Sequence, residues 1–226
     1  FASVKLVEHK KTHERFAAKI NDPCQEEDAI SEKVIVSEIS ILARVQAPTI
    51  IRLVGFSLKD FNNDNNITFL LEYKSNGSLK DLIDKESKSR APPEYDNTTK
   101  QIILCGIAHG MMILHSRRVL HRDLKPANVL LDSQYRPFIT DFGLSKYFDP
   151  DLSRSKFHIE CGTPLYMAPE VFDGEPHTEK SDVYSFGILM FEVITGQPAF
   201  TGVKSATNLG VRVLRGERPK SDTPIP

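Results

Sequence analysis

The chain has 226 residues, so its length predicts one large domain or two small ones. Hydrophobic residues make up 40% and charged residues 26%, which is ordinary globular usage and excludes intrinsic disorder and collagen-like repeats. Lys and Arg number 29 against 30 Asp and Glu, a formal net charge of −1, so no chain-wide field would attract nucleic acid or an anionic membrane. Any anion must be bound locally.

The first third of the chain contains two pairs of strand signals. Apolar runs at residues 1–7 and 16–20 flank a charged turn. The runs at 53–58 and 67–73 flank the Asn-rich cluster 62–66, which is rich in turn-forming residues. Two antiparallel hairpins are therefore expected.

The segment between the hairpins, residues 25–46, is predicted to be a helix that ends before Pro48. Glu38 lies within its apolar stripe, which consists of Ile30, Val34, Ile41 and Val45. A carboxylate facing the core is tolerable only when it is paired, and the preceding strand offers one cation, Lys19. Either residue alone would be unremarkable surface, but together they predict a Lys19–Glu38 ion pair.

After a loop-like break at residues 74–77 the pattern becomes helical. Helices are expected at 98–116 and at 183–194, and the second is apolar almost all round, which predicts burial at the centre of a lobe. Short strands are expected at 129–131 and 137–140. The architecture is therefore α+β, with a small β-rich lobe, a hinge near Tyr73 and Lys74, and a larger helical lobe.

The three cysteines, Cys24, Cys105 and Cys161, are scattered and form no CxxC pair. This usage indicates reduced thiols in a cytoplasmic protein and argues against a zinc site. The longest apolar stretch, residues 102–114, is too short to cross a bilayer, so no membrane segment is expected.

Three motifs follow in order along the second half. His121-Arg122-Asp123-Leu124-Lys125-Pro126-Ala127-Asn128 comes after the first long helix, Asp141-Phe142-Gly143 after a strand signal, and Ala168-Pro169-Glu170 further on. With Lys19 and Glu38, this ordered set resembles the protein kinase family over the whole chain. The resemblance implies a two-lobed kinase-like fold, with an N-terminal lobe over residues 1–73 and a C-terminal lobe over 74–226.

The resemblance also implies ATP-dependent phosphoryl transfer, which needs positioning and charge stabilisation more than covalent chemistry. Asp123 would accept or orient the proton of the substrate hydroxyl, and Lys125 would neutralise the γ-phosphate. Lys19 would contact the α- and β-phosphates and be held by Glu38.

Asn128 and Asp141 are hard oxygen ligands that would hold Mg²⁺. Short polar residues of this kind also form turns after a helix or a strand, which explains each residue singly but not the ordered set. His121 is expected to be a packing residue beneath Phe142, with Leu42 continuing that packing, and not the general base.

The resemblance assigns an adenine site to the small lobe and the hinge. Leu71 occupies the gatekeeper position, and its bulk should narrow the back of the site. The residues expected to sandwich adenine or to present hinge backbone groups to it are Val4, Ala17 and Leu130, and Glu72, Tyr73 and Lys74.

Two positions in the sequence indicate which type of hydroxyl group would accept the phosphoryl group. Lys125 after the His-Arg-Asp triplet, and Gly162-Thr163-Pro164, resemble serine/threonine kinases rather than tyrosine kinases. Asp182-Val183-Tyr184-Ser185-Phe186-Gly187 and the turn Gly77-Ser78-Leu79 are similar to the tyrosine-kinase-like branch. Protein substrates with serine or threonine are therefore the expected partners, and no nucleic acid is expected.

The polar loop between Gly143 and Thr163 is expected to be an activation segment. Phosphorylation of Ser153 or Ser155, by an upstream kinase or by the chain itself, would place an anion near Arg122. The alternative is an unregulated solvated loop. Thr163, at the end of the segment, is also expected to be a regulatory residue.

Two departures from the family pattern stand out. The chain begins at the expected tip of a glycine-rich loop, with Phe1 at its aromatic position and Ala2 in place of the third glycine. It ends at Pro226, before the expected last helices of the large lobe. We therefore expect a domain truncated at both ends, with apolar surface exposed on the large lobe where those helices would pack. The competing functions are a pseudokinase scaffold, which binds partners or nucleotide without turnover, and a small-molecule kinase.

Overall fold

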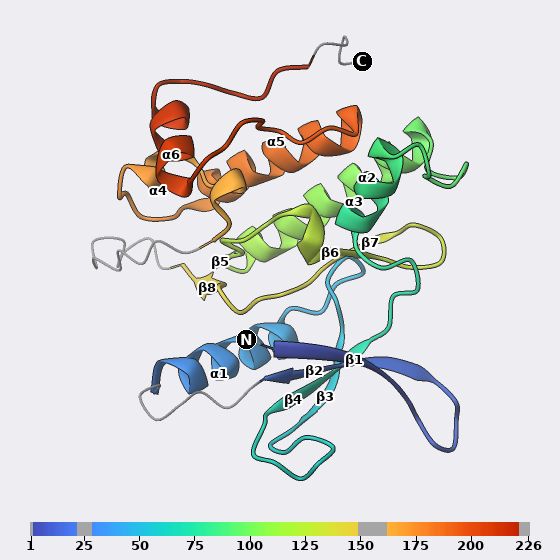
Figure 1. Cartoon of the computed structure of the whole chain (residues 1–226). Helices are drawn as coiled ribbons and strands as arrows, with labels where there is room; N and C mark the ends of the chain where they lie inside the picture. Colours follow the sequence, from blue (N-terminus) through green and yellow to red (C-terminus); the bar gives the residue numbers. More distant parts are fainter. Residues whose placement is uncertain (1, 22–28, 149–161, 222–226) are drawn as a thin grey trace.

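The computed structural model describes residues 2–21, 29–148 and 162–221. Figure 1 shows two lobes, with a β-sheet and one helix in the first and most of the helices in the second. The α+β two-lobed fold expected from the sequence is confirmed.

The small lobe is built on one antiparallel sheet with the strand order β1-β2-β4-β3. Its elements are β1 (Ala2–Glu8), β2 (Arg15–Asn21), α1 (Ala29–Arg44), β3 (Leu53–Ser57) and β4 (Thr68–Glu72). Because β1 pairs with β2 and β3 with β4, the two predicted hairpins are both present. Pairing of β2 with β4 joins the hairpins into one sheet.

Helix α1 buries Glu38 and Ile41, and Val45, directly after the helix, is buried as well, as the predicted stripe requires. The prediction for Val34 is wrong, because this side chain is 38% exposed. It lies one turn before Glu38 on the same helix. The helix ends at Arg44, two residues before the expected end, and its predicted start at Gln25 lies outside the described residues.

The large lobe is mainly helical. Its helices are α2 (Leu79–Ser87), α3 (Asn97–Ser116), α4 (Pro169–Phe172), α5 (Glu179–Thr195) and α6 (Ala206–Leu214). Two short antiparallel ladders join β5 (Val119–Leu120) to β8 (Lys146–Tyr147), and β6 (Val129–Leu131) to β7 (Pro137–Ile139). Helices α2 and α6 are additions to the predicted set, and each begins with a serine N-cap, at Ser78 and Ser205.

Helix α5 is buried around most of its circumference, as expected, except for one stripe that carries Val183 and Met190. Ile188, Leu189 and Val193 lie in the core, whereas Val183 is 54% exposed and Met190 is also exposed. Within the described part of the chain, no helix is long and apolar enough to span a membrane.

The hydrophobic core runs without interruption from the small lobe into the large one. The segment between α1 and β3 connects the two lobes through two backbone hydrogen bonds. The N–H of Ile51 donates to the carbonyl of Ile139 (2.9 Å), and the N–H of Ile139 donates to the carbonyl of Thr49 (2.9 Å). Strand β7 is therefore held by the small lobe as well as by β6. Since β7 leads directly to Asp141, this join positions a predicted site residue.

Helix α3 packs on β7 through glycines. A Cβ atom at Gly106 would lie 2.5 Å from Cγ of Pro137, and one at Gly110 would lie 2.7 Å from Cδ1 of Ile139. Both distances are shorter than any stable contact between carbon atoms, and the Pro137 ring cannot swing aside. The absence of side chains at these two positions is what allows α3 to approach β7.

We expect Gly106→Ala to destabilise the protein by about 1–3 kcal/mol, because the new methyl group overpacks the contact with Pro137. The matched control is Gly187→Ala in α5, where a Cβ meets nothing within 4 Å. There the better helix propensity of alanine should stabilise the protein by up to about 1 kcal/mol. Chemical denaturation measures both changes, and equal effects of the two substitutions would contradict the packing argument.

Candidate active site

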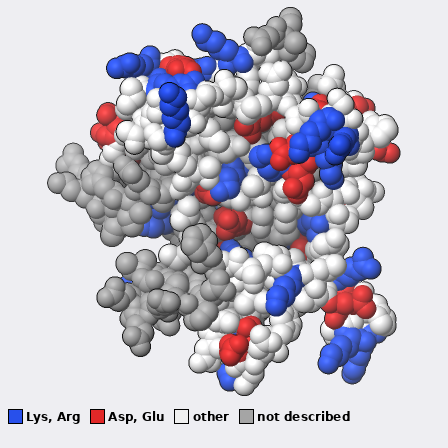
Figure 2. All heavy atoms as spheres, viewed as in Figure 1, with Lys and Arg blue, Asp and Glu red and all other residues white. Residues whose placement is uncertain are grey.

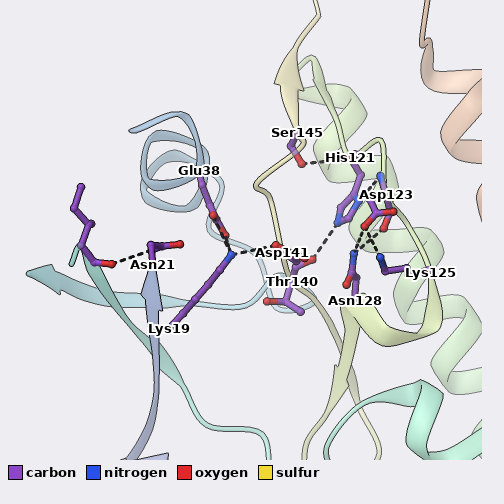
Figure 3. A network of polar contacts seen from close by, with 11 residues as sticks. Lys19, Asn21, Glu38, His121, Asp123, Lys125, Asn128, Thr140, Asp141 and Ser145 are labelled. Atoms are coloured by element: carbon purple, nitrogen blue, oxygen red, sulfur yellow. Dashed lines mark hydrogen bonds and ion pairs between the residues drawn. The ribbon is translucent and has the colours of Figure 1, made fainter. Parts of the chain in front are cut away.

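Lys19, Glu38 and Asp141 form a charged triad between the lobes (Figure 3). The Nζ atom of Lys19, on β2, lies 2.7 and 3.0 Å from the two carboxylate oxygens of Glu38 on α1. The same Nζ lies 3.1 Å from Oδ1 of Asp141, which follows β7. The expected Lys19–Glu38 pair is therefore present, and it extends across the lobe boundary to a third residue.

The electrostatics of the triad favour the charged forms of Lys19 and Asp141, whereas burial raises the pKa of Glu38 above its usual value despite the neighbouring Lys19. Burial by itself lowers the pKa of Lys19, but the two neighbouring carboxylates outweigh that effect and raise this pKa above its usual value. Burial works to raise the pKa of Asp141, and the charge and hydrogen bond of Lys19 more than offset it, so this pKa lies below its usual value. The site therefore presents a fixed cation next to a fixed carboxylate.

The Asp123 carboxylate is buried and accepts hydrogen bonds on both oxygens. Thr163 donates its backbone N–H (2.8 Å) and its hydroxyl (2.7 Å) to Oδ1. Lys125 Nζ (2.7 Å) and Asn128 Nδ2 (3.0 Å) donate to Oδ2. These donors fix the orientation of the carboxylate, and they bring Thr163 into direct contact with Asp123 and Lys125.

The loop that carries Asp123 is anchored by Asp182 of α5. Oδ2 of Asp182 accepts the backbone N–H of His121 (2.9 Å), and Oδ1 accepts that of Arg122 (2.9 Å). His115 Nε2 lies 2.9 Å from Oδ2. From the sequence, Asp182 indicates only a branch of the family, and its anchoring role is missed because the polar residues that precede it, 179–181, make it inconspicuous.

Two residues of the site have left-handed backbone conformations, Arg122 with φ 68° and Asp141 with φ 64°. Residues other than glycine adopt this region at a cost, and such conformations are often found at functional sites. His121, which precedes Arg122, is fully buried, and its ring centroid lies 5.3 Å from that of Phe142. With Leu42 in the same core, His121 occupies the packing position expected for it.

Asn128 and Asp141 have the chemistry that a magnesium site needs. Asn128 donates through its amide nitrogen to the main-chain and side-chain oxygens of Asp123, which directs its carbonyl oxygen away from them. Among the described residues, Asp141 receives a side-chain hydrogen bond only from Lys19, at Oδ1. One amide oxygen and one carboxylate oxygen thus remain as hard ligands, so the two residues fit Mg²⁺.

The predicted adenine-binding residues share one face of the small-lobe sheet. The strand register places Val4 opposite Lys19, and Ala17 opposite Leu71, so their side chains point the same way. Val4 is 67% exposed, while Leu71, the expected gatekeeper, is buried. Leu6, opposite Ala17 and also exposed, belongs to this face and was missed, although its two-residue spacing from Val4 on a strand indicates it.

The hinge residues lead from this face to the large lobe. After Glu72 and Tyr73 the chain runs along β6, where Asn76 donates its N–H to the carbonyl of Leu131 (3.0 Å). Ser78 forms a bridge with Leu130, the residue expected on the other side of adenine. The structure therefore brings the hinge and Leu130 together.

The proposed regulatory serines, Ser153 and Ser155, lie outside the described residues, as do Cys24 and Cys161. Arg122 is described, and its Nη1 donates a long hydrogen bond to the carbonyl of Leu144 (3.4 Å). On the face shown in Figure 2, basic and acidic side chains are interspersed and not segregated. This agrees with local rather than global attraction of anions.

Comparison with known proteins identifies the family. The model of the protein kinase domain matches residues 1–218. A probable serine/threonine-protein kinase of Dictyostelium discoideum is 37% identical over 81% of this chain. The serine/threonine-protein kinase CTR1 of Arabidopsis thaliana is 35% identical over 88% of it, and the cell cycle serine/threonine-protein kinase CDC5/MSD2 of Saccharomyces cerevisiae is 38% identical over 83%. The matches cover 17%, 24% and 25% of these relatives, respectively.

We expect Asp182→Asn to destabilise the protein at pH 7 by about 3 kcal/mol, because an amide cannot accept all the hydrogen bonds that the buried carboxylate accepts. Burial works to raise the pKa of Asp182, but the His115 hydrogen bond, the charge of His121 and the two backbone donors hold it below its usual value. A depressed pKa stabilises the fold above about pH 4, the ordinary pKa of Asp, and this contribution is lost as the pH falls through the folded-state value.

The difference in unfolding free energy between wild type and Asp182→Asn should therefore narrow below about pH 4. Urea denaturation across a pH series measures it. Asp84→Asn, which removes an exposed ion pair with Lys80, is the control and should change stability by less than about 1 kcal/mol. A difference that stays constant from pH 7 to pH 3 would show that the Asp182 charge is not what anchors the loop.

Proposed function

The chain belongs to the protein kinase family, and we propose that it transfers the γ-phosphoryl group of ATP to serine and threonine hydroxyls of protein substrates. The observation that carries this proposal is the contact of Lys19 with both Glu38 and Asp141. That contact joins a phosphate-binding cation in the small lobe to a metal-binding carboxylate in the large lobe. A site that spans both lobes can hold a nucleotide between them.

The residues of the chain divide the work of the reaction. Lys19, held by Glu38, would bind the α- and β-phosphates, and Lys125 would offset the charge of the γ-phosphate. Asp123, held by its four donors, would orient the attacking hydroxyl and take its proton. Mg²⁺, when held by Asn128 and Asp141, would supply charge neutralisation to the phosphate oxygens.

The small-lobe face and the hinge would bind the base of ATP. Val4, Leu6 and Ala17 would cover adenine from one side and Leu130 from the other, while the backbone of residues 72–74 would supply hydrogen bonds. The exposure of Val4 and Leu6 supports this role, because both present apolar surface that a bound base would cover.

The preference for serine and threonine is supported by the contact between Lys125 and Thr163, whose Nζ and Oγ1 atoms are 2.6 Å apart. This contact closes a ring of hydrogen bonds around Asp123 through residues of the Ser/Thr pattern. The names of the relatives agree with this acceptor class. Membership of the tyrosine-kinase-like branch and a cytoplasmic location are further parts of the proposal.

Replacing Asp123 by Asn tests the mechanism. The variant should lower Mg²⁺-dependent phosphoryl transfer to a peptide library by at least about 100-fold, because the amide cannot take the proton of the hydroxyl. Nucleotide binding, measured by titration with Mg·ATP, should persist. The control is Asp64→Asn in the connection between β3 and β4, where transfer should remain at the wild-type level.

Three results would overturn the proposal. Persistence of transfer in Asp123→Asn would refute the role of Asp123. Nucleotide binding without transfer by the wild-type chain would favour the pseudokinase scaffold, although Lys19, Asp123, Asn128 and Asp141 are all present. Transfer to small metabolites only would favour the small-molecule kinase.

We also propose that phosphorylation of Ser153 or Ser155 activates the enzyme through Arg122. The Nε atom of Arg122 is buried without a hydrogen-bond partner in the part of the chain that is described, which makes this guanidinium suited to an anion. Ser153→Ala combined with Ser155→Ala should abolish the activation that phosphorylation confers. Equal specific activity of the phosphorylated wild-type protein and the double variant would refute this regulation.

A further inference from the structure

The side chain of Lys74 is buried at the hinge, where a lysine would ordinarily extend into solvent. Only 8% of it is exposed, and its Nζ atom lies 3.1 Å from the centroid of the Phe138 ring. Lys74 follows the last strand of the small lobe, whereas Phe138 is on β7 of the large lobe. A cation placed over an aromatic face and shielded from water is attracted to it by the ring quadrupole. This contact therefore joins the hinge to the large lobe.

Glu72 holds the other side of the same ammonium group. Its Oε2 atom lies 3.0 Å from Lys74 Nζ, and its Oε1 atom accepts the backbone N–H of Arg52 (2.9 Å). Glu72 also donates its own N–H to the carbonyl of Arg52 (3.1 Å). Since Glu72 ends β4 and Arg52 precedes β3, these two hydrogen bonds with Arg52 fix Glu72 in the small lobe.

The position of Phe138 links this contact to the proposed adenine site. Phe138 lies directly opposite Leu130 in the β6–β7 ladder, so the two side chains point to the same face of that hairpin. Lys74 is thus held against the face that would form one side of the adenine site. The distance between this face and the small-lobe sheet depends on where the hinge is fixed.

We propose that Glu72, Lys74 and Phe138 form a hinge latch that sets the separation of the two lobes for nucleotide binding, with Lys74 as a positioning residue. Its role in binding rests on the proposed function, whereas the contacts themselves belong to the fold. The ammonium group is the centre of the latch, because it contacts both Glu72 and Phe138. Two residues in the β6–β7 turn also interact with this ammonium group: the negative charge of Asp132 favours its charged form, and the positive charge of Arg136 disfavours it.

Removing the charge should open the latch without removing the side chain. Lys74→Met keeps the length of the chain and its apolar contact with Phe138, but it leaves Glu72 without its cation. Lys74→Arg keeps the charge and can lie on the ring. The matched control is Lys80→Met on α2, which removes a lysine from an exposed ion pair with Asp84 close to the hinge in sequence.

Hydrogen exchange tests the latch independently of any activity. The amides of Glu72 and Asn76 report on it, because they donate to Arg52 and Leu131 at either end of the hinge. Lys74→Met should accelerate their exchange by about 10-fold, whereas Lys74→Arg and Lys80→Met should leave it unchanged. Phe138→Leu should have a similar effect, and the double variant Lys74→Met with Phe138→Leu should exchange no faster than the faster single variant.

Nucleotide binding tests the role of the latch in the reaction. Lys74→Met should raise the KM for ATP and the dissociation constant of Mg·ATP by about five-fold, with a smaller effect on kcat, since the chemistry is on other residues. Lys74→Arg should restore both constants to within about two-fold of wild type.

Three results would overturn the latch: unchanged exchange in Lys74→Met, additive effects in the double variant, or equal effects of Lys74→Met and Lys74→Arg. Should Lys74→Met fail to fold, Phe138→Leu tests the latch by itself, because unchanged exchange of the Glu72 and Asn76 amides in that variant would also overturn it. Absence of transfer by the wild-type chain would count against the proposed function alone, because the exchange measurements do not depend on it.

Discussion

The buried carboxylate of Asp182 is the contact on which the catalytic loop depends. It accepts successive backbone N–H groups, from His121 and Arg122, and so holds a left-handed turn against the central helix α5. A loop alone has little to oppose its conformational entropy, and a charge-assisted bond to a rigid helix supplies that order. The orientation of Asp123, one residue later, follows from this anchor together with the donors on its own oxygens.

The two lobes act as one body at the site, although each has its own architecture. One apolar core passes from α1 and β4 into α3 and β7, and Ile139 exchanges hydrogen bonds with the connection between α1 and β3. Lys19 then bridges Glu38 and Asp141 across the same boundary. Because interiors are closely packed, a shift of α1 would move Glu38 and strain this bridge. The residues that we propose to bind phosphate and metal are therefore coupled through packing as well as through charge.

Sequence reasoning predicted the parts of the molecule that are encoded locally. The hairpins follow from strand signals and turn residues, and the Lys19–Glu38 pair follows from one charge inside an apolar stripe. It failed where the outcome depends on tertiary neighbours. Val34 shares the apolar stripe of α1 but is exposed, and Val183 lies on a part of α5 that no described residue covers. The burial of Lys74 depends on Phe138, which is 64 positions later in the sequence. No local pattern reports on such contacts.

The glycines of α3 have a consequence for how natural variation in this chain should be interpreted. Gly106 and Gly110 contact β7, which ends two residues before Asp141, so the position of that carboxylate relative to α3 depends on the absence of two methyl groups. In a survey of random variants, larger residues at these positions would be scored as losses of activity, although no reacting group had changed. They would resemble active-site positions by phenotype while serving as spacers in the scaffold.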